Sequence, residues 1–398
     1  MKTKRRIVRI KNVVKPIAEP VINTIRDLAE SGRLSGILLL VATAVAMIWA
    51  NSSQGAAFLG FWKQKVGFPP LDKTISHWVN DGLMAVFFFF VGLEIKREFL
   101  VGELSDWRQA VLPVVAALGG AIVPAAIYLA FNADTIAADG WAIPTATDIA
   151  FSLGMLSLLG KRVPFALKVL LTAIAVIDDL IAVLVIALFY THEIHSDMLL
   201  GAAATLAVLL ALNYFKVLRF VFYLIPGLLL WFFVLKSGVH ATIAGVLLAM
   251  TIPLSQLGKI EHALYKPVNY LIMPIFALAN TGIVLAGDVS ALLTLPLSLG
   301  IVAGLFLGKP LGIVLFSWGV VKSGMAKLPT GLKWRHIFGL GFTAGIGFTM
   351  SIFIASLSFP DAVQQSSAKL AIMVGTVLSG IVGLLWLVKV KKTMARNP

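Results

Sequence analysis

The chain is a succession of long apolar segments, about twelve of them, joined by short polar stretches. Most approach the roughly 20 residues that a helix needs to cross the apolar core of a bilayer. Only 13% of the residues are charged, whereas an average soluble protein has about 25%. We therefore expect an all-α polytopic membrane protein. The apolar segments are Leu34–Ala50, Gly82–Glu94, Ala110–Phe131, Trp141–Leu159, Val163–Tyr190, Met198–Asn213, Phe220–Leu235, Gly238–Leu254, Ala263–Ala286, Leu293–Val320, Ile337–Leu357 and Ala368–Val388.

Lysine and arginine are concentrated in every second loop, and the loops between carry mainly acidic residues. Cytoplasmic loops of membrane proteins have this excess of positive charge. Because the number of expected spans is even, both termini are then expected in the cytoplasm. The basic loops hold Lys96, Arg97 and Arg108; Lys161 and Arg162; Lys216 and Arg219; Lys259 and Lys266; Lys322, Lys327, Lys333 and Arg335; and Lys389, Lys391, Lys392 and Arg396. The acidic loops hold Asp134, Asp139, Glu193, Asp197, Asp288 and Asp361.

Three parts are expected along the chain. Residues 1–33 form a basic cytoplasmic tail that ends in a helix on the membrane surface, because apolar residues recur at helical spacing over 17–28. Residues 34–388 form a single transmembrane domain, in which the polar stretch 51–80 is an extracytoplasmic loop or hairpin. Residues 389–398 are a second cytoplasmic tail. The sequence has no cysteine, which excludes disulfides and thiol chemistry.

One predicted span carries two adjacent aspartates, Asp178 and Asp179, near its centre. Each costs about 2.5–3.5 kcal/mol in the middle of a membrane helix, and an intramembrane carboxylate is by default a functional residue. Neighbouring residues of a helix point about 100° apart. We therefore expect one carboxylate to face a cavity and the other to face a neighbouring helix. A buried carboxylic acid can bind its proton near neutral pH, where that proton competes with a cation.

Two further spans contain helix-breaking residues. The first has Pro144 followed by Thr145, Thr147 and Asp148, and proline removes a backbone donor from a helix. The second has Gly341, Gly345 and Gly347 interleaved with Thr343 and Thr349, and glycine weakens a helix by about 1 kcal/mol relative to alanine. Each lies in the second span of a three-span group, about 110–190 and about 293–388. Interruptions at corresponding positions of two halves indicate a transport site.

Lys309 is a single cation inside a predicted span, and it follows a run of glycines at Gly300, Gly304 and Gly308. Glycine at every fourth position gives a flat face for close helix contact. A buried lysine needs a carboxylate partner, and the intramembrane candidates are Asp148, Asp178 and Asp179. Helix ends in the membrane carry about half a charge each. Asp148 is expected to offset the positive ends, and Lys309 to offset the negative ends or to pair with Asp178.

At this level of detail the sequence resembles the NhaA-type sodium/proton antiporter family from about Ala29 to Leu387. The matching motifs begin at Asn80, Val91, Ala146, Ala175, Lys236 and Gly308, and include Ala175-Val176-Ile177-Asp178-Asp179-Leu180. The resemblance implies twelve spans, with the two three-span groups as inverted repeats whose broken helices cross at mid-membrane. It also implies a small β-hairpin within 58–76 that joins a homodimer, surrounding membrane lipid, and a bacterial inner-membrane location.

The resemblance also implies roles for single residues. Asp178 and Asp179 correspond to the pair that binds Na⁺ and protons, Asp148 and Thr147 to the first broken helix, and Lys309 to the membrane lysine. The interruptions at Pro144, Thr343, Gly345 and Gly347 belong to the broken helices. A cytoplasmic-side group associated with the response to pH corresponds to Glu94, Arg97, Glu98, Glu261 and His262, and His240 lies in a further matching motif. Tyr265 stands where some relatives have another histidine.

The implied activity is electrogenic, pH-regulated exchange of cytoplasmic Na⁺ or Li⁺ for external protons, with no cofactor, no enzymatic step and no nucleic acid. Asp179, with oxygens of Asp178 and Asp148, is expected to hold a dehydrated cation, since hard cations favour oxygen ligands. The alternative is a sodium-coupled symporter of similar fold, which would need a polar pocket for an anion. An intramembrane aspartyl protease would need Gly-x-Gly-Asp, whereas Leu285 precedes Gly287-Asp288 here. A membrane scaffold would need none of these buried charges.

Overall fold

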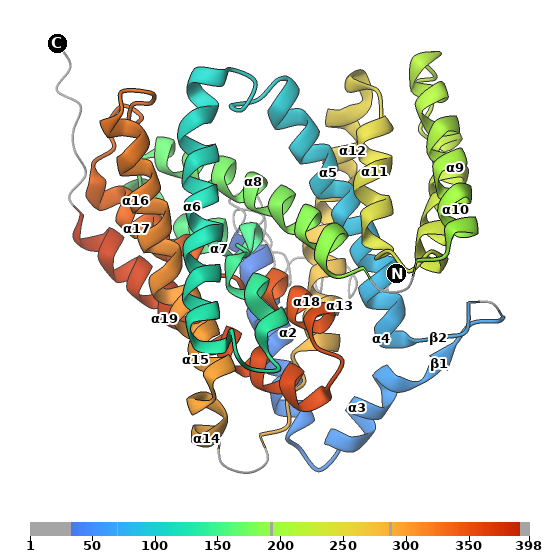
Figure 1. Ribbon diagram of the computed structural model, residues 1–398, viewed down its shortest axis with the longest axis horizontal. Helices are drawn as coiled ribbons and strands as arrows, with labels where there is room; N and C mark the ends of the chain where they lie inside the picture. The colour runs from blue at the N-terminus through green and yellow to red at the C-terminus, as the bar shows by residue number, and fades with distance from the viewer. Residues whose placement is uncertain (1–32, 70, 192–193, 286–288, 391–398) are drawn as a thin grey trace, which may run out of the picture.

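The computed structural model describes residues 33–69, 71–191, 194–285 and 289–390. The expected surface helix before residue 33, and loop residues such as Glu193 and Asp288, lie outside the described residues. The described chain is largely helical, with one two-stranded sheet, as the composition predicts (Figure 1).

The elements follow one another as printed on Figure 1. They are α2 (Arg33–Ala50), α3 (Gly55–Lys63), β1 (Lys65–Val66), β2 (Lys73–Thr74), α4 (Ile75–His77), η1 (Trp78–Leu83), α5 (Met84–Leu100), α6 (Trp107–Asn132), η2 (Ala138–Thr145), α7 (Ile149–Leu158), η3 (Gly160–Arg162), α8 (Phe165–Phe189), α9 (Ser196–Tyr214), α10 (Val221–Lys236), α11 (Thr242–Thr251), α12 (Leu254–Pro267), η4 (Val268–Ile272), α13 (Met273–Asn280), α14 (Val289–Thr294), α15 (Pro296–Ala303), η5 (Gly304–Gly308), α16 (Lys309–Lys322), α17 (Trp334–Ala344), α18 (Phe348–Ser358) and α19 (Ala362–Lys389).

Six helices in the described ranges are long and apolar enough to cross a membrane. Two bent pairs raise the number to eight if each is one span, since α17 and α18 meet at 48° and α2 and α3 at 113°. Helix length therefore does not confirm the predicted count of about twelve. The shortfall arises where predicted spans are divided: α11 has only 10 residues, and η2 precedes the 10-residue α7.

The segment after α2 forms the predicted hairpin, but in a smaller part of it than expected. β1 and β2 pair antiparallel, with Lys65 opposite Thr74 and Val66 opposite Lys73, and they project from the helical body (Figure 1). Gly67 in the connecting turn has a φ of 135°, a conformation that favours glycine. The stretch 51–80 is not all loop, because α3 occupies Gly55–Lys63 and a helix restarts at Ile75. The Thr74 hydroxyl caps that helix by accepting from His77 N at 3.2 Å.

The predicted glycine face makes the close helix contact that its spacing suggested. α6 and α16 approach so closely that a Cβ added to Gly312 would lie 2.0 Å from the Gly119 carbonyl oxygen. A Cβ on Gly308 would lie 2.8 Å from Pro124 Cα, and one on Gly304 would lie 2.6 Å from Pro144 Cβ. These contacts hold Lys309, the first residue of α16, in the interior of the helical body.

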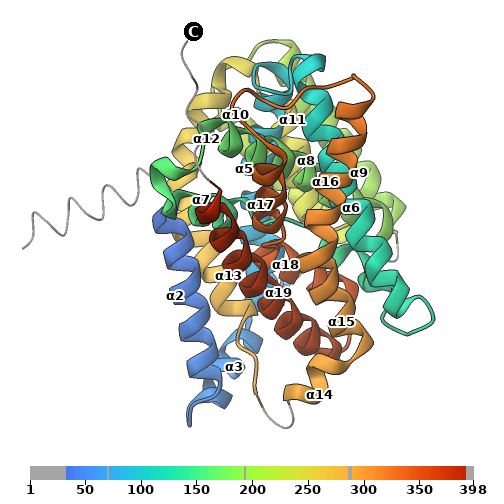
Figure 2. The same ribbon diagram turned by 90° about the vertical axis from the view of Figure 1, so that its left-hand side faces the viewer.

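The two predicted interruptions are real breaks in the chain path, and they meet. Residues 146–148 are unwound between η2 and α7, and residues 345–347 separate α17 from α18. The half before the first break is a 3₁₀ helix, not the α-helix expected over Trp141–Leu159. The backbone N–H of Asp148 donates to the carbonyl of Ile346 at 2.7 Å, which joins the breaks directly. Figure 2 shows α19 running obliquely across α17 and α18.

Candidate functional site

Asp148 lies at the junction of the two breaks and caps both of the helices that begin there. Its Oδ1 accepts from the N–H of Phe151 in α7 at 3.0 Å, and its Oδ2 accepts from the N–H of Thr349 in α18 at 3.2 Å and from the Thr349 hydroxyl. The side chain is buried, so these bonds satisfy donors that water does not reach. The carboxylate also faces two positive helix ends, which is the arrangement that the sequence suggested for it.

Hydroxyl groups occupy the opposite, negative end of the second break. The Ser152 hydroxyl donates to the carbonyl of Thr343 at 2.9 Å. The Thr147 hydroxyl lies 2.8 Å from the carbonyl of Ala344 and 2.6 Å from Oδ2 of Asp178. A hydroxyl has one proton to donate, so Thr147 serves one of these two acceptors at a time. These two hydroxyls, and not Lys309, contact the last carbonyls of α17.

Lys309 pairs with Asp178, which answers the question of its partner that the sequence left open. The Lys309 Nζ lies 2.5 Å from Oδ2 of Asp178, and both side chains are fully buried. One turn of π-helix, η5, directly precedes Lys309. Such a turn shifts the helical register and often occurs at functional sites. The pair links α16 to the centre of α8.

The two aspartates of α8 face different surroundings, as their spacing suggested. Oδ2 of Asp178 is engaged by Lys309 and Thr147, while Oδ1 is buried with no hydrogen-bond partner among the described residues. The side chain of Asp179 lines a cavity and forms no hydrogen bond with any residue that the structure describes. One carboxylate oxygen of Asp178 and the whole carboxylate of Asp179 are therefore left without a protein donor.

The cavity next to Asp179 has a volume of about 600 Å³ and a strongly acidic wall. Its carboxylates belong to Asp148, Asp179, Glu94, Glu98, Glu103 and Glu261. Among the described residues that line it, Lys168 is the only lysine or arginine. A concave wall of one charge sign raises the local concentration of the opposite ion. The cavity is therefore suited to collect cations and to lead them to Asp179.

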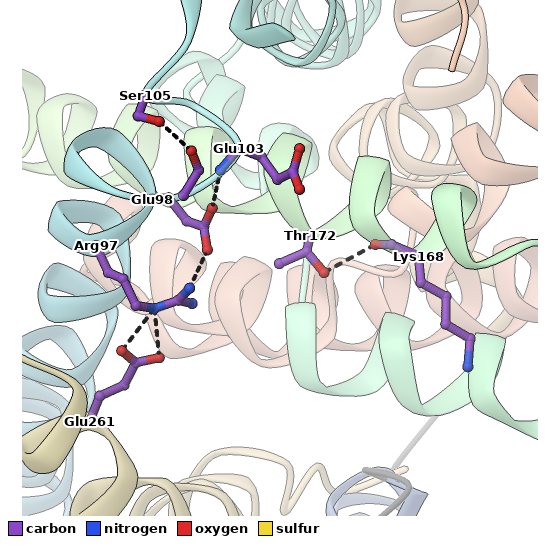
Figure 3. Close-up of polar contacts among 8 residues, drawn as sticks. Arg97, Glu98, Glu103, Ser105, Lys168, Thr172 and Glu261 are labelled. Atoms are coloured by element: carbon purple, nitrogen blue, oxygen red, sulfur yellow. Dashed lines mark hydrogen bonds and ion pairs between the residues drawn. The ribbon is translucent and has the colours of Figure 1, made fainter. Parts of the chain in front are cut away.

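An ion-pair network stands at the end of the cavity where α5 and α12 approach each other (Figure 3). Arg97 contacts Oε1 of Glu98 at 2.7 Å and Oε2 of Glu261 at 2.9 Å. Oε2 of Glu98 accepts from the N–H of Glu103 at 3.1 Å, which fastens the loop after α5 to the same network. Lys168 and Thr172 lie across from it on α8.

The predicted pH-response residues fall into two sets. Glu94, Arg97, Glu98 and Glu261 come together at this network. His262 is exposed and is not among the described residues that line the cavity, because the residue after Glu261 on a helix points about 100° away. Tyr265, one turn after Glu261, lines the cavity instead. His240 is also outside the network.

His240 lies at the far end of α8. Its Nε2 is 2.7 Å from the carbonyl of Tyr190, the residue that follows α8. This contact fixes the start of α11 to the end of α8, and it separates His240 from the ion-pair network by the length of that helix.

Several site residues were missed from the sequence. Thr349 and Ser152 bind the helix ends at the breaks, and their positions in the first turn of α18 and of α7 were the available signal. Glu103 and Lys168 line the cavity. Both looked like ordinary loop charges, and only the folding of the loop over Glu98 brings Glu103 inward.

Comparisons with known proteins agree with this geometry. The model of the family described as Na⁺/H⁺ antiporter 1 matches residues 26–387. The chain is 51% identical over 374 residues to a Na⁺/H⁺ antiporter NhaA of Dechloromonas aromatica, covering 92% of this chain and 95% of that protein. It is 52% identical to the antiporter NhaA 1 of Klebsiella pneumoniae, with 88% and 92% covered, and 49% identical to the NhaA antiporter of Vibrio cholerae, with 90% and 96% covered.

Proposed function

The chain belongs to the Na⁺/H⁺ antiporter 1 family, and on that premise we propose how its buried site exchanges the two ions. The protein is a multi-pass bacterial membrane transporter that exchanges Na⁺ for H⁺. It is a transporter, not an enzyme, and its function needs no cofactor. The observation that carries the site assignment is the carboxylate of Asp179, which faces an acidic cavity without a protein donor, next to the unpartnered Oδ1 of Asp178.

The proposed cation ligands are the Asp179 carboxylate and Oδ1 of Asp178, with water from the cavity completing the shell. Hard cations of this kind prefer oxygen ligands. The Oδ2 atom of Asp178 is held by Lys309 and Thr147, which orients Oδ1 for the ion. Both oxygens of Asp148 already accept hydrogen bonds from helix ends. We therefore assign Asp148 to ordering the breaks and not to the first coordination shell.

The ion pair of Lys309 with Asp178 controls the proposed number of protons. If the pair stays closed, only Asp179 is free to trade a proton for Na⁺, and the exchange of one for one moves no net charge. A second proton per Na⁺ requires the pair to open so that Asp178 also binds a proton. The exchange then moves charge, and the membrane potential contributes about 2.3 kcal/mol per charge per 100 mV. We propose this second, electrogenic course.

The proposed orientation has the acidic cavity open to the cytoplasm. The cavity reaches the ends of α5 and α12 that adjoin basic loops, as the bias of positive charge towards the cytoplasm requires. On the other side of Asp179, Phe353 packs against Phe88 and Phe276 with ring centroids 5.4 and 6.2 Å apart, and all three are buried. In our proposal these rings close the path, and a rocking of the bundle opens it after the ion is bound.

The wider architecture is part of the same proposal. The paired breaks support two inverted three-helix repeats, about 110–190 and 293–388, within about twelve spans of an inner-membrane protein that has both termini in the cytoplasm. The hairpin within 58–76 supports a homodimer, because its strands present exposed edges and the side chain of Phe68 is 70% exposed. The network of Arg97, Glu98 and Glu261 is the proposed site of the pH response.

The alternative of a sodium-coupled symporter is not favoured by the relatives, which are named as antiporters. The cavity argues in the same direction. Six carboxylates and the single ammonium of Lys168 line its described wall, and an organic anion would be repelled there.

The decisive experiment uses the purified full-length chain in lipid vesicles with an imposed pH gradient. We expect added Na⁺ or Li⁺ to collapse the gradient, while choline leaves it unchanged. Asp179→Asn in the same vesicles should abolish the response. If Na⁺ produced no proton movement in wild-type vesicles, or if Asp179→Asn moved protons normally, the proposed site would be wrong.

A further inference from the structure

A second cavity, which the exchange mechanism does not use, lies between the starts of α6 and α8 and the loop from α16 to α17. Its volume is about 800 Å³, within the range of about 300–1,000 Å³ that is typical of small-molecule sites. Most of its wall is apolar, including Leu112, Val169 and Leu170. Phe165 and Met325 line it and are themselves 79% and 64% exposed. The cavity therefore combines an apolar chamber with an apolar rim.

The charged groups of this cavity come from three different segments. Arg108 in α6 and Lys327 in the loop after α16 both line it, and neither forms an ion pair within the described ranges. Glu103, in the loop after α5, supplies a carboxylate. Figure 3 shows this carboxylate turned away from Glu98, while the backbone N–H of Glu103 holds the loop in place. Two cations and one anion thus stand over an apolar chamber.

We propose that this cavity binds a phospholipid whose headgroup carries a phosphate and a primary ammonium, as in phosphatidylethanolamine. Arg108 and Lys327 would donate to the phosphate, and Glu103 would accept from the ammonium, all as charge-assisted hydrogen bonds. An acyl chain would lie along the apolar wall. Trp107 is next to Arg108 and is 73% exposed, as expected of a tryptophan at the boundary between lipid and water.

The three charges distinguish this lipid from its relatives. A headgroup with a phosphate and no ammonium satisfies Arg108 and Lys327 but leaves Glu103 facing an anion. A choline headgroup brings a positive charge, but its quaternary nitrogen has no N–H to donate. Only the primary ammonium satisfies the carboxylate by hydrogen bonding while the phosphate meets both cations.

Bound lipid would also contact a wall that the two cavities share. Glu103, Phe165, Val169 and Ala173 line both this cavity and the acidic one. Three of them belong to the first half of α8, the helix that carries Asp179. The lipid would therefore support the half of α8 that has a cavity on either side.

The test measures lipid binding to the full-length protein in detergent by native mass spectrometry, so that it does not depend on transport. Phosphatidylethanolamine, phosphatidylcholine and phosphatidylglycerol with identical chains are compared, together with free glycerophosphoethanolamine. We expect phosphatidylethanolamine to bind about tenfold more tightly than the other two lipids, since a charge-assisted hydrogen bond has about that effect on affinity. The free headgroup should bind far more weakly than the lipid.

Three variants assign the contacts. Arg108→Gln with Lys327→Gln should weaken the binding of all three phospholipids about tenfold. Glu103→Gln should abolish the preference for ethanolamine over choline and relieve the penalty on the glycerol headgroup. The matched control, Lys333→Gln with Arg335→Gln, removes the same charge from the start of α17 and should bind like wild type.

Equal binding of the three lipids to wild type would overturn the proposal without any variant. So would a preference for phosphatidylglycerol, or binding of the free headgroup as tight as that of the lipid. The proposal also fails if the control double variant loses as much affinity as the variant at Arg108 and Lys327.

Discussion

Lys309 donates to one oxygen of Asp178 at 2.5 Å, while the other oxygen of the same carboxylate has no partner among the described residues. The two atoms of one side chain thus have different tasks. Oδ2 anchors α16 to α8, and Oδ1 is available to an ion next to Asp179. The pair is buried, and breaking such a pair from one side leaves an uncompensated charge.

The two aspartates of α8 should both be required for exchange. Asp179→Asn and Asp178→Asn keep the shape of the side chain but remove the charge that binds Na⁺, so Na⁺-driven proton movement in vesicles should fall to the level of protein-free vesicles. Asp134→Asn, an exposed loop change, is the control and should behave like wild type. Exchange at the wild-type rate by either α8 variant would refute the assignment.

Lys309→Ala should destabilise the protein by about 3–5 kcal/mol, because it leaves Asp178 charged and buried without its partner. Thermal unfolding in detergent measures the loss. Adding Asp178→Asn to Lys309→Ala removes the stranded charge and should restore much of the stability. If the double variant were as unstable as Lys309→Ala alone, the Asp178 charge would not be the cause.

Asp148→Ala should cost about 1–3 kcal/mol for each helix N–H that it leaves unsatisfied in Phe151 and Thr349. Asp148→Asn keeps an acceptor oxygen and should cost less. The unfolding midpoints of the two variants separate these effects, with Ser152→Ala as a comparison at the opposite helix end. Equal losses for Asp148→Ala and Asp148→Asn would show that the charge, and not the acceptor geometry, is what the site needs.

Activity should fall below neutral pH mainly because protons occupy Asp178 and Asp179 in place of Na⁺. For one competing proton, the apparent Michaelis constant for Na⁺ should rise about tenfold per pH unit decrease, with an unchanged maximal rate, by mass action on the shared site. His262→Ala should have no effect, because His262 points away from the cavity. A maximal rate that collapses at low pH in saturating Na⁺ would instead place the response in the network of Arg97, Glu98 and Glu261.

Lys168 should weaken the attraction of the acidic cavity for Na⁺. It lies 11 residues before Asp179 in α8, about 16 Å along the helix axis. At that distance Lys168→Gln should lower the apparent Michaelis constant for Na⁺ by about two- to fivefold. Lys168→Arg keeps the charge and serves as the control. The gain should shrink in high salt, which screens such interactions, and a gain that is independent of salt would argue for a packing effect.

The sequence predicted the helical fold, the hairpin, the two breaks and the residues that gather around them. Its limits are physical. A span is recognised by about 20 apolar residues, so the short α11 and the 3₁₀ helix η2 were counted as whole spans. The partner of Lys309 depends on the rotation of α16, which the π-helical turn η5 shifts.

Side-chain direction was the other limit. Glu261 and His262 are neighbours in the sequence, but a helix turns only one of them towards the cavity. In the same way, Glu103 becomes part of the site only because its loop folds back onto Glu98, a contact between residues that show no periodic pattern.

The close approach of Gly119 and Gly312 also limits how the molecule can move. Where a carbonyl of one helix fills the place of a missing side chain on the other, sliding by even one residue would drive backbone into backbone. α6 and α16 must therefore travel as one rigid lever, with Lys309 fixed to it. A disulfide engineered across that seam should leave turnover intact, whereas one placed across a moving boundary would arrest it.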